Sequence, residues 1–407
     1  MSQQDQRAVL QQLFTRRNFM RAAGLSAAAG VLAACGSDET PATTSSSAAT
    51  TAGSSAGTST SASAETSMSS ATSEGTASAT GSATGGAGPS VAPGTYGTIA
   101  LQLSWIKNIE FAGEFFADSK GYYTQAGFEK VDLVSGPVDS ADALVFANSV
   151  DIGLSAPDAT ARLVSEQGAP LKIIGSTFQK NPFCILSLEE GKPIRTPEDL
   201  KGKKIGIQTG TNQSIFAGFL SANGIDASEL EQVAVGFEPT PLTAGEVDGF
   251  MAYLTNEPFI VKADGKTPVT LSFADNGLPL TAETFTVTEE TITSKRDMLK
   301  AFLWAEIKGW NDAVADPAGS AKLAVETYGS DLGLDIPGQT EQAEAQNTLV
   351  VSDETKTNGL FTISDTLMGQ IGEALVAVGI TDVTTDQLFD LSLLEEVYAE
   401  YPDLIVG

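Results

Sequence analysis

The chain has 407 residues, with 23 Lys and Arg against 51 Asp and Glu and no His, which gives a formal net charge of −28. A surface this acidic repels nucleic acid, because phosphate backbones are bound by clustered Lys and Arg. The absence of His excludes Ser-His-Asp and Cys-His catalysis and His-ligated zinc. Cys35 and Cys184 are the only thiols, so no Cys-rich metal site or disulfide framework is expected. We expect neither a metal nor a cofactor.

The first 34 residues have the pattern of an export signal. Arg16 and Arg17 are followed by Phe19 and Met20, as in a twin-arginine signal, and a short Ala-rich apolar stretch comes next. That stretch is too short for a good transmembrane span. It ends in Leu-Ala-Ala-Cys35, which resembles a bacterial lipobox and implies cleavage before Cys35 and lipidation of its sulfur. The alternative is an accidental Arg pair before an apolar helix, and the order and spacing of the two signals favour export.

Residues 35–95 form the predicted linker. From residue 36 to about residue 92 the sequence is almost wholly Ser, Thr, Ala and Gly. Such a segment buries too little apolar surface to offset its conformational entropy, so we expect a flexible tether. At roughly 5–6 Å times the square root of its length, its reach is about 40 Å.

The remaining chain, residues 96–407, alternates short β-branched runs with amphipathic helical stretches, which indicates an α/β fold with mostly parallel sheets. Taken in chain order, strands are predicted at 98–104, 131–134, 152–154, 171–177, 183–186, 233–236 and 249–253, and a short helix that leads into a strand is predicted within 193–207. Helices are predicted at 110–120 and 141–149, within 210–224, and later at 295–315, 317–328, 341–349 and 364–378.

The late return of helices after a strand-rich middle predicts one lobe interrupted by another. Lobe one is predicted at 96–187 and 283–407, and lobe two at 188–282. Ligands of such sheets bind in the crevice outside the carboxyl ends of the strands.

Four segments together resemble the thiamine-pyrimidine-synthase-like family of periplasmic binding proteins. Residues 103–128 contain a Trp, then Phe-Ala-Gly, then a helix ending in Lys-Gly-Tyr-Tyr, and the other segments are 196–207, 245–258 and 302–317. The resemblance implies a two-lobed periplasmic-binding-protein fold of type 2, with helices flanking each sheet and a ligand cleft between the lobes. The family includes importer components for riboflavin and thiamine pyrimidine precursors, with nitrate, taurine and alkanesulfonate binders as relatives.

Two departures from that family bear on the chemistry. Its enzymatic branch uses a sacrificial His, pyridoxal phosphate and a Cys-rich iron site, none of which this composition supports. Many pyrimidine-precursor binders carry His before Ala-Gly, where this chain has Phe111. Phe-Ala-Gly is more similar to the riboflavin-binding members, which favours a flat aromatic ligand.

The predicted ligand-binding residues follow predicted strands or lie in the turn beyond them. They are Trp105, Asn108, Phe111, Asp158, Phe178, Gln179, Thr211, Asn212, Glu238, Thr255, Asn256 and Glu257.

Each of these side chains also has a structural interpretation. Aromatic faces stack on planar heterocycles, but core packing is the alternative for Trp105 and Phe111. Asn108 and Asp158 can bond a ring edge or a hydroxyl, or they can cap a helix. For Glu257 the alternative is a solvated or hinge-bonding acid.

We therefore expect an extracytoplasmic solute-binding lipoprotein, anchored to the outer face of the cell membrane and monomeric. It would deliver riboflavin or a thiamine pyrimidine precursor to an ABC permease and its ATPase by domain closure about hinges near 186–190 and 280–285. The alternatives are a binder of alkanesulfonate, taurine or nitrate, an exported enzyme using Asp158, Glu238 or Glu257 as acid and base, and a surface sensor without an importer.

Overall fold

The computed structural model describes residues 88–406. The predicted export signal with Arg16 and Arg17, the lipidation site Cys35 and most of the predicted linker lie outside the described residues. Within the described range, no helix has both the length and the apolar character needed to cross a membrane.

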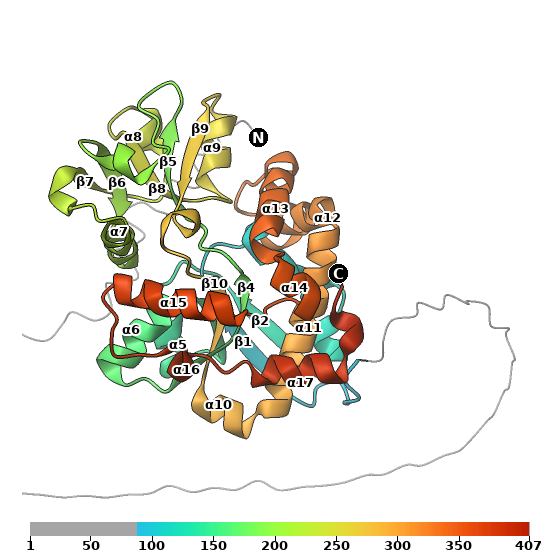
Figure 1. Ribbon diagram of the computed structural model, residues 1–407. Coiled ribbons are helices and arrows are strands. Elements are labelled where there is room, and N and C mark those ends of the chain that lie inside the picture. Colours follow the sequence, from blue (N-terminus) through green and yellow to red (C-terminus); the bar gives the residue numbers. More distant parts are fainter. Residues whose placement is uncertain (1–87, 407) are drawn as a thin grey trace, which may run out of the picture. The chain divides into compact units, whose positions relative to one another are not determined.

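Two five-stranded sheets organise the described residues (Figure 1). The first sheet has the order β2 (Lys130–Val134), β1 (Thr98–Gln102), β3 (Ile152–Ser155), β10 (Ala282–Thr288) and β4 (Leu171–Phe178). The second has the order β7 (Glu231–Val235), β6 (Lys204–Gln208), β8 (Gly249–Tyr253), β5 (Phe183–Leu188) and β9 (Pro268–Ser272).

Each sheet is mostly parallel, with one reversed strand. In the first sheet β1 pairs in parallel with β2 and β3, while β10 is antiparallel to β3 and β4. In the second sheet β6 pairs in parallel with β7 and β8, while β5 is antiparallel to β8 and β9. The reversed strands are the first ones that the chain forms after it crosses from one sheet to the other. The fold is thus the α/β, two-sheet architecture that the sequence predicts.

The first crossing lies earlier than predicted. Residues 183–187 were assigned to lobe one, but β5 pairs with β8 and β9 in the second sheet because its apolar side chains complete that sheet's core. The chain therefore crosses at 179–182 and returns at 273–281, just before β10.

Helices flank both sheets (Figure 1). Their bounds are α3 (Ala112–Ser119), α4 (Tyr122–Gln125), α5 (Ala141–Phe146), α6 (Pro157–Gln167), α7 (Thr211–Ala222), α8 (Thr240–Thr243), α9 (Glu257–Ala263), α10 (Glu289–Ser294), α11 (Arg296–Ala315), α12 (Pro317–Leu323), α13 (Ile336–Val350), α14 (Asp353–Asn358), α15 (Asp365–Ala377), α16 (Thr385–Leu388) and α17 (Ser392–Glu400).

Local sequence explains where these helices begin and end. Pro157 occupies the first turn of α6, where its missing N–H costs nothing, and Gly168 ends the helix in the left-handed region at φ 61°. Helix α13 begins at Ile336, earlier than the predicted 341, because the Asp335 carboxylate accepts a hydrogen bond from the Gly338 N–H.

The first core lies between the first sheet and the long helix α11. Helix α3 packs directly on α11, and a Cβ placed on Gly309 would lie 2.1 Å from the Gly113 carbonyl oxygen. No larger residue fits that backbone contact. Leu101, Phe285 and Phe302 are fully buried in this core.

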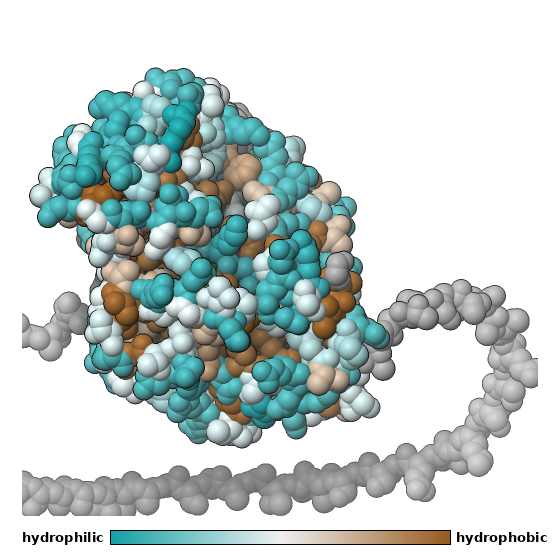
Figure 2. Space-filling model, in the orientation of Figure 1, coloured by the Kyte–Doolittle hydropathy of each residue, from teal (hydrophilic) through white to brown (hydrophobic). Residues whose placement is uncertain are grey.

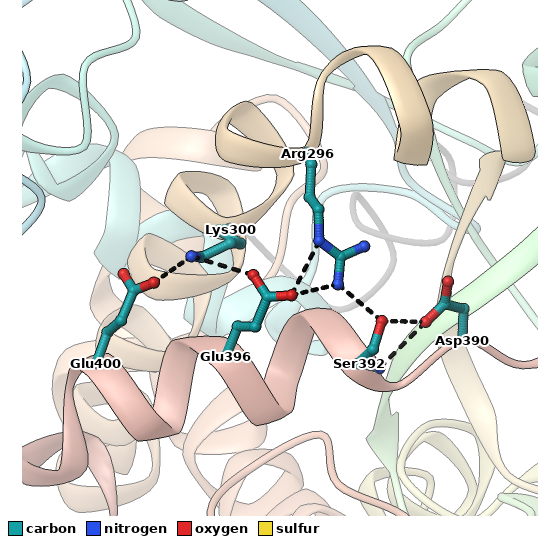
Figure 3. Close-up of polar contacts among 6 residues, drawn as sticks. All are labelled: Arg296, Lys300, Asp390, Ser392, Glu396 and Glu400. Atoms are coloured by element: carbon teal, nitrogen blue, oxygen red, sulfur yellow. Dashed lines mark hydrogen bonds and ion pairs between the residues drawn. The ribbon is translucent and has the colours of Figure 1, made fainter.

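Helix α11 is also joined to the C-terminal helix α17 by charge (Figure 3). The Arg296 guanidinium donates to Glu396 at 2.6 and 3.0 Å and to the Ser392 hydroxyl at 2.8 Å. Lys300 bridges Glu396 and Glu400. A shared network of this kind holds two helices in register better than isolated surface ion pairs do.

The face of the molecule in Figure 2 is mostly hydrophilic, with apolar side chains in small separate areas.

A second apolar cluster joins the lobes. Phe216 and Phe219 of α7, in the second lobe, share it with Ile371 and Leu375 of α15, which follows the return crossing. A Cβ on Gly218 would lie 2.3 Å from a methyl group of Val378, so the helices meet closely. Figure 1 shows α7 directly above α15. We call this contact the α7–α15 seam.

Candidate ligand-binding site

A cavity of about 440 Å³ opens between the two sheets, and residues of both lobes line it. Ser104 and Trp105 follow β1, Thr209 to Asn212 follow β6, and Phe237 follows β7. Strand exits of both sheets therefore meet at one place, as expected for parallel sheets that bind a ligand at their carboxyl ends.

Four aromatic side chains give the cavity flat apolar surfaces. Trp105 of the first lobe meets Phe237 of the second, with ring centroids 5.0 Å apart and an interplanar angle of 64°. Phe183 and Tyr253 form a second edge-to-face pair at 4.7 Å and 82°. Aromatic side chains stack well on planar ligands, so a wall with these four rings suits a flat ligand.

Amide side chains in the wall are held by hydrogen bonds. Gln208 donates to the Met251 carbonyl at 3.0 Å, and Asn212 donates to the Gln208 side-chain oxygen at 3.0 Å. These bonds fix the orientation of both amides before any ligand arrives.

Glu257 lines the cavity at the start of α9 and is only 7% exposed. Its carboxylate accepts the Tyr253 N–H at 2.8 Å and the Asn256 amide at 3.1 Å. Burial nevertheless raises the pKa of Glu257 to about 7, with Glu238 adding like-charge repulsion. Desolvation outweighs the two hydrogen bonds because it acts on the whole charged group.

A second buried acidic group comes from the first lobe. The Ser104 hydroxyl contacts both carboxyl oxygens of Glu283 at 2.9 and 3.0 Å, and Glu283 is hydrogen-bonded in turn to Glu110. Burial raises the pKa of Glu110 to about 7, although its hydrogen bond to Glu283 acts in the opposite direction. Burial, with repulsion from Glu110, raises the pKa of Glu283 well above its ordinary value. We call Glu110 and Glu283 the carboxyl pair.

The backbone at Glu283 is strained. Its φ of 51° lies in the left-handed region, which residues other than Gly, Asn and Asp rarely adopt. Strain of this kind persists only where the surroundings impose it, and it gathers at functional sites.

Five of the residues predicted from the sequence line the cavity. They are Trp105, Thr211, Asn212, Asn256 and Glu257. Glu238 follows Phe237 and is half-buried, next to the cavity wall.

The other six lie outside the cavity wall. Phe111 and Phe178 are fully buried in the first core, and Asn108 caps a short helix by accepting the Glu110 N–H at 3.0 Å. Gln179 donates to the Ser176 carbonyl at 3.1 Å, and Thr255 is buried.

Asp158, the sixth, is 1% exposed, and burial raises its pKa to about 6.

Several wall residues were not predicted from the sequence. Ser104, Gln208, Phe237 and Tyr253 lie at the end of a strand or just beyond one, so the strand-exit rule contained the signal for them. Phe183 instead begins the reversed strand β5, which the rule does not cover. Glu110 and Glu283 carry no such signal, because only the folded structure brings them together.

Comparison with protein-family models and with known proteins identifies the family of this chain. A family model described as NMT1/THI5 like matches residues 108–320, more than half of the chain. The chain belongs to the NMT1/THI5-like family. Among its relatives is the riboflavin-binding protein RibY of Chloroflexus aurantiacus, 26% identical over 58% of this chain and 70% of the relative. The 4-amino-5-hydroxymethyl-2-methylpyrimidine phosphate synthase of Schizosaccharomyces pombe is 29% identical, but over only 33% of this chain and 39% of the synthase.

Solved structures show that this chain shares its fold with periplasmic binding proteins. The periplasmic nitrate-binding protein NrtA from Synechocystis PCC 6803 superposes with a TM-score of 0.57 at 14% identity, covering 78% of this chain and 92% of that one. At that identity the likeness concerns the fold.

The buried carboxyls predict an unusual pH dependence of stability. The pKa of Glu257 rises from 4.5 to about 7 on folding, so between those values the folded state binds more protons than the unfolded state. The free energy of unfolding must then fall as the pH rises through that window. At about 1.4 kcal/mol per pKa unit, Glu257 alone accounts for about 3 kcal/mol.

Chemical unfolding at pH values from 5 to 8 checks this expectation. The Glu257→Gln variant should lose less stability over that range than the native chain, by up to about 3 kcal/mol. Glu395→Gln, at an exposed position of α17, is the matched control. Parallel pH profiles for the native chain and Glu257→Gln would show that Glu257 is not protonated in the folded state.

Proposed function

We propose that this protein is an extracytoplasmic solute-binding protein that captures a small planar heterocycle for an ABC importer. The observation that carries the proposal is the cavity of about 440 Å³ with aromatic walls from both lobes. A ligand there would lie between two separate sheets, and the described part of the chain crosses from one sheet to the other twice, at 179–182 and 273–281. Such an arrangement suits binding by domain closure, with an ABC permease and its ATPase as partners of the closed form.

The composition of the wall supports a heterocycle over an inorganic anion. Nitrate and sulfonate binding favours Arg or rows of N–H donors. Among the described residues that line the cavity there is no Lys or Arg, while Glu110, Asp139 and Glu257 are acidic. The named ligand of the relative RibY supports riboflavin, and the similarity to pyrimidine synthases supports a thiamine pyrimidine precursor.

A binder of nitrate, taurine or alkanesulfonate is the second candidate, favoured by the fold shared with NrtA. An enzymatic role is less well supported. The match to the pyrimidine phosphate synthase covers a third of this chain, and the chain has no His to act as a general base.

A thermal-shift panel on the purified full-length chain tests the proposal. It includes riboflavin, hydroxymethyl- and formylamino-pyrimidines, thiamine, taurine, an alkanesulfonate and nitrate. A ligand at about a hundred times its Kd adds about 2.7 kcal/mol and should raise the midpoint by several degrees.

A shift with a flavin or a pyrimidine is the expected result. A shift with taurine, sulfonate or nitrate alone would replace the proposed ligand with the second candidate. No shift with any compound would contradict a binding function of this class.

We further propose that the protein is a lipoprotein held at the outer face of the cell membrane through Cys35. Cys35→Ala should leave the exported protein in the soluble fraction, and replacing Arg16 and Arg17 together by Lys should block export, because the twin-arginine pathway reads that pair. Cell fractionation with immunoblotting measures both effects.

Cys184→Ala is the matched control, since Cys184 is buried in the second sheet and should not affect partitioning. Membrane association that survives in Cys35→Ala would count against the lipid anchor.

A further inference from the structure

The carboxyl pair and Glu257 approach the cavity from opposite lobes. Glu110 and Glu257 both line it, and Glu283 lies behind Ser104, another wall residue. Each of these three acids is at most 7% exposed. The second lobe thus presents one buried carboxyl group to the cavity and the first lobe presents two, either directly or through Ser104.

None of the described residues that line the cavity is a Lys or Arg that could pair with these carboxyl groups. Burial penalises the charged form of a carboxyl group, and the raised pKa values of Glu110 and Glu257 reflect that cost. A carboxyl group accepts hydrogen bonds in either protonation state, and it also donates one when it is protonated. A hydroxyl group, which both donates and accepts, suits such a group in either state.

The cavity volume calls for more than a single ring. A cavity of about 150 Å³ suffices to hold benzene, and this one measures about 440 Å³. The aromatic pairs Trp105–Phe237 and Phe183–Tyr253 would contact a flat apolar portion of the ligand. The acids must then face a separate polar portion that is rich in donors.

We propose that the carboxyl pair and Glu257 bind the hydroxyl groups of a polyol chain carried by the planar ligand, and that this chain decides which heterocycles the cleft accepts. The inference rests on the proposed function, since it concerns the same cavity. It adds a chemical class, a heterocycle with a polyhydroxylated substituent, and it assigns specificity to Glu110, Glu257 and Glu283.

The strained backbone of Glu283 fits this role. Residue 283 adopts φ 51° within β10, and its side chain reaches Ser104 and Glu110 at the cavity edge. A carboxyl group held this way is positioned before the ligand arrives, which lowers the entropic cost of forming hydrogen bonds to it.

Riboflavin and lumiflavin form a matched pair of probes, because they share the flavin ring system and differ in the ribityl chain. Isothermal titration of the full-length chain should give riboflavin at least about tenfold higher affinity than lumiflavin, because hydrogen bonds to charged groups are strong. Glu110→Gln and Glu257→Gln should each weaken riboflavin binding about tenfold and leave lumiflavin binding unchanged.

Two controls keep the test specific. Glu395→Gln should bind both flavins like the native chain, and the thermal midpoint of each variant shows that it is folded. Because Glu110→Gln and Glu257→Gln alter different lobes, a folding defect in one leaves the other as a test.

The other outcomes contradict the inference in distinguishable ways. Equal affinity for the two flavins, or equal loss of both in the variants, overturns the role of the polyol and leaves the proposed function standing. Tighter binding of the cationic ring compound proflavine than of riboflavin would assign the acids to a charged N–H edge instead. Binding of neither flavin nor any other heterocycle of the panel overturns the inference and the proposed function together.

Discussion

The two crossings between the sheets are fixed to each other by one buried amide. Asn181 lies in the first crossing and is 2% exposed. Its side chain donates to the Leu278 carbonyl in the return crossing at 3.1 Å and accepts the Phe183 N–H at 3.0 Å. Asn181 thus connects the start of β5 with the segment that precedes β10. Strands β5 and β10 are the reversed strands of the second and the first sheet, respectively. The junction therefore helps to set the position of the cavity residues of one lobe relative to those of the other.

The α7–α15 seam is a second connection between the lobes, and it limits how they can move. Its apolar side chains belong to one continuous buried cluster that includes residues of both lobes. Separating them would expose apolar surface at about 25 cal/mol per Å². The lobes are therefore best suited to a rotation that keeps the seam packed while the Trp105–Phe237 contact across the cavity opens.

The cleft combines features that oppose stability. It holds buried acids with no Lys or Arg among the wall residues that the structure describes, and it holds a strained Glu283. Departures of this kind from stable packing are expected where a site is kept ready for a ligand. The contacts that stabilise the folded state lie elsewhere, in the first core, in the α11–α17 ion-pair network and in the α7–α15 seam.

Much of the fold follows from the sequence, because strand runs and helix caps are local signals. The α/β class and the strand order along the chain are of this kind, whereas the first crossing was placed too late because Phe183–Leu188 reads equally well as a strand of either sheet. The strand-exit rule found Trp105, Thr211, Asn212, Asn256 and Glu257, which line the cavity. It also selected Phe111 and Phe178, since sequence gives the position of an aromatic side chain along a strand or helix but not the side toward which it packs.

The carboxyl pair was beyond prediction for a different reason. Glu110 and Glu283 are far apart in sequence, and their meeting depends on the return crossing and on the unusual φ at residue 283. Neither hydrophobic periodicity nor a short motif encodes such a contact.

The central claim is that the ligand is enclosed between the lobes, and a crystal structure of the chain with the best ligand of the thermal-shift panel tests it most directly. The account predicts that the ligand occupies the cavity and contacts Trp105 and Glu110 of one lobe and Tyr253 and Glu257 of the other. A ligand held by one lobe alone, or bound outside the cavity, would contradict it.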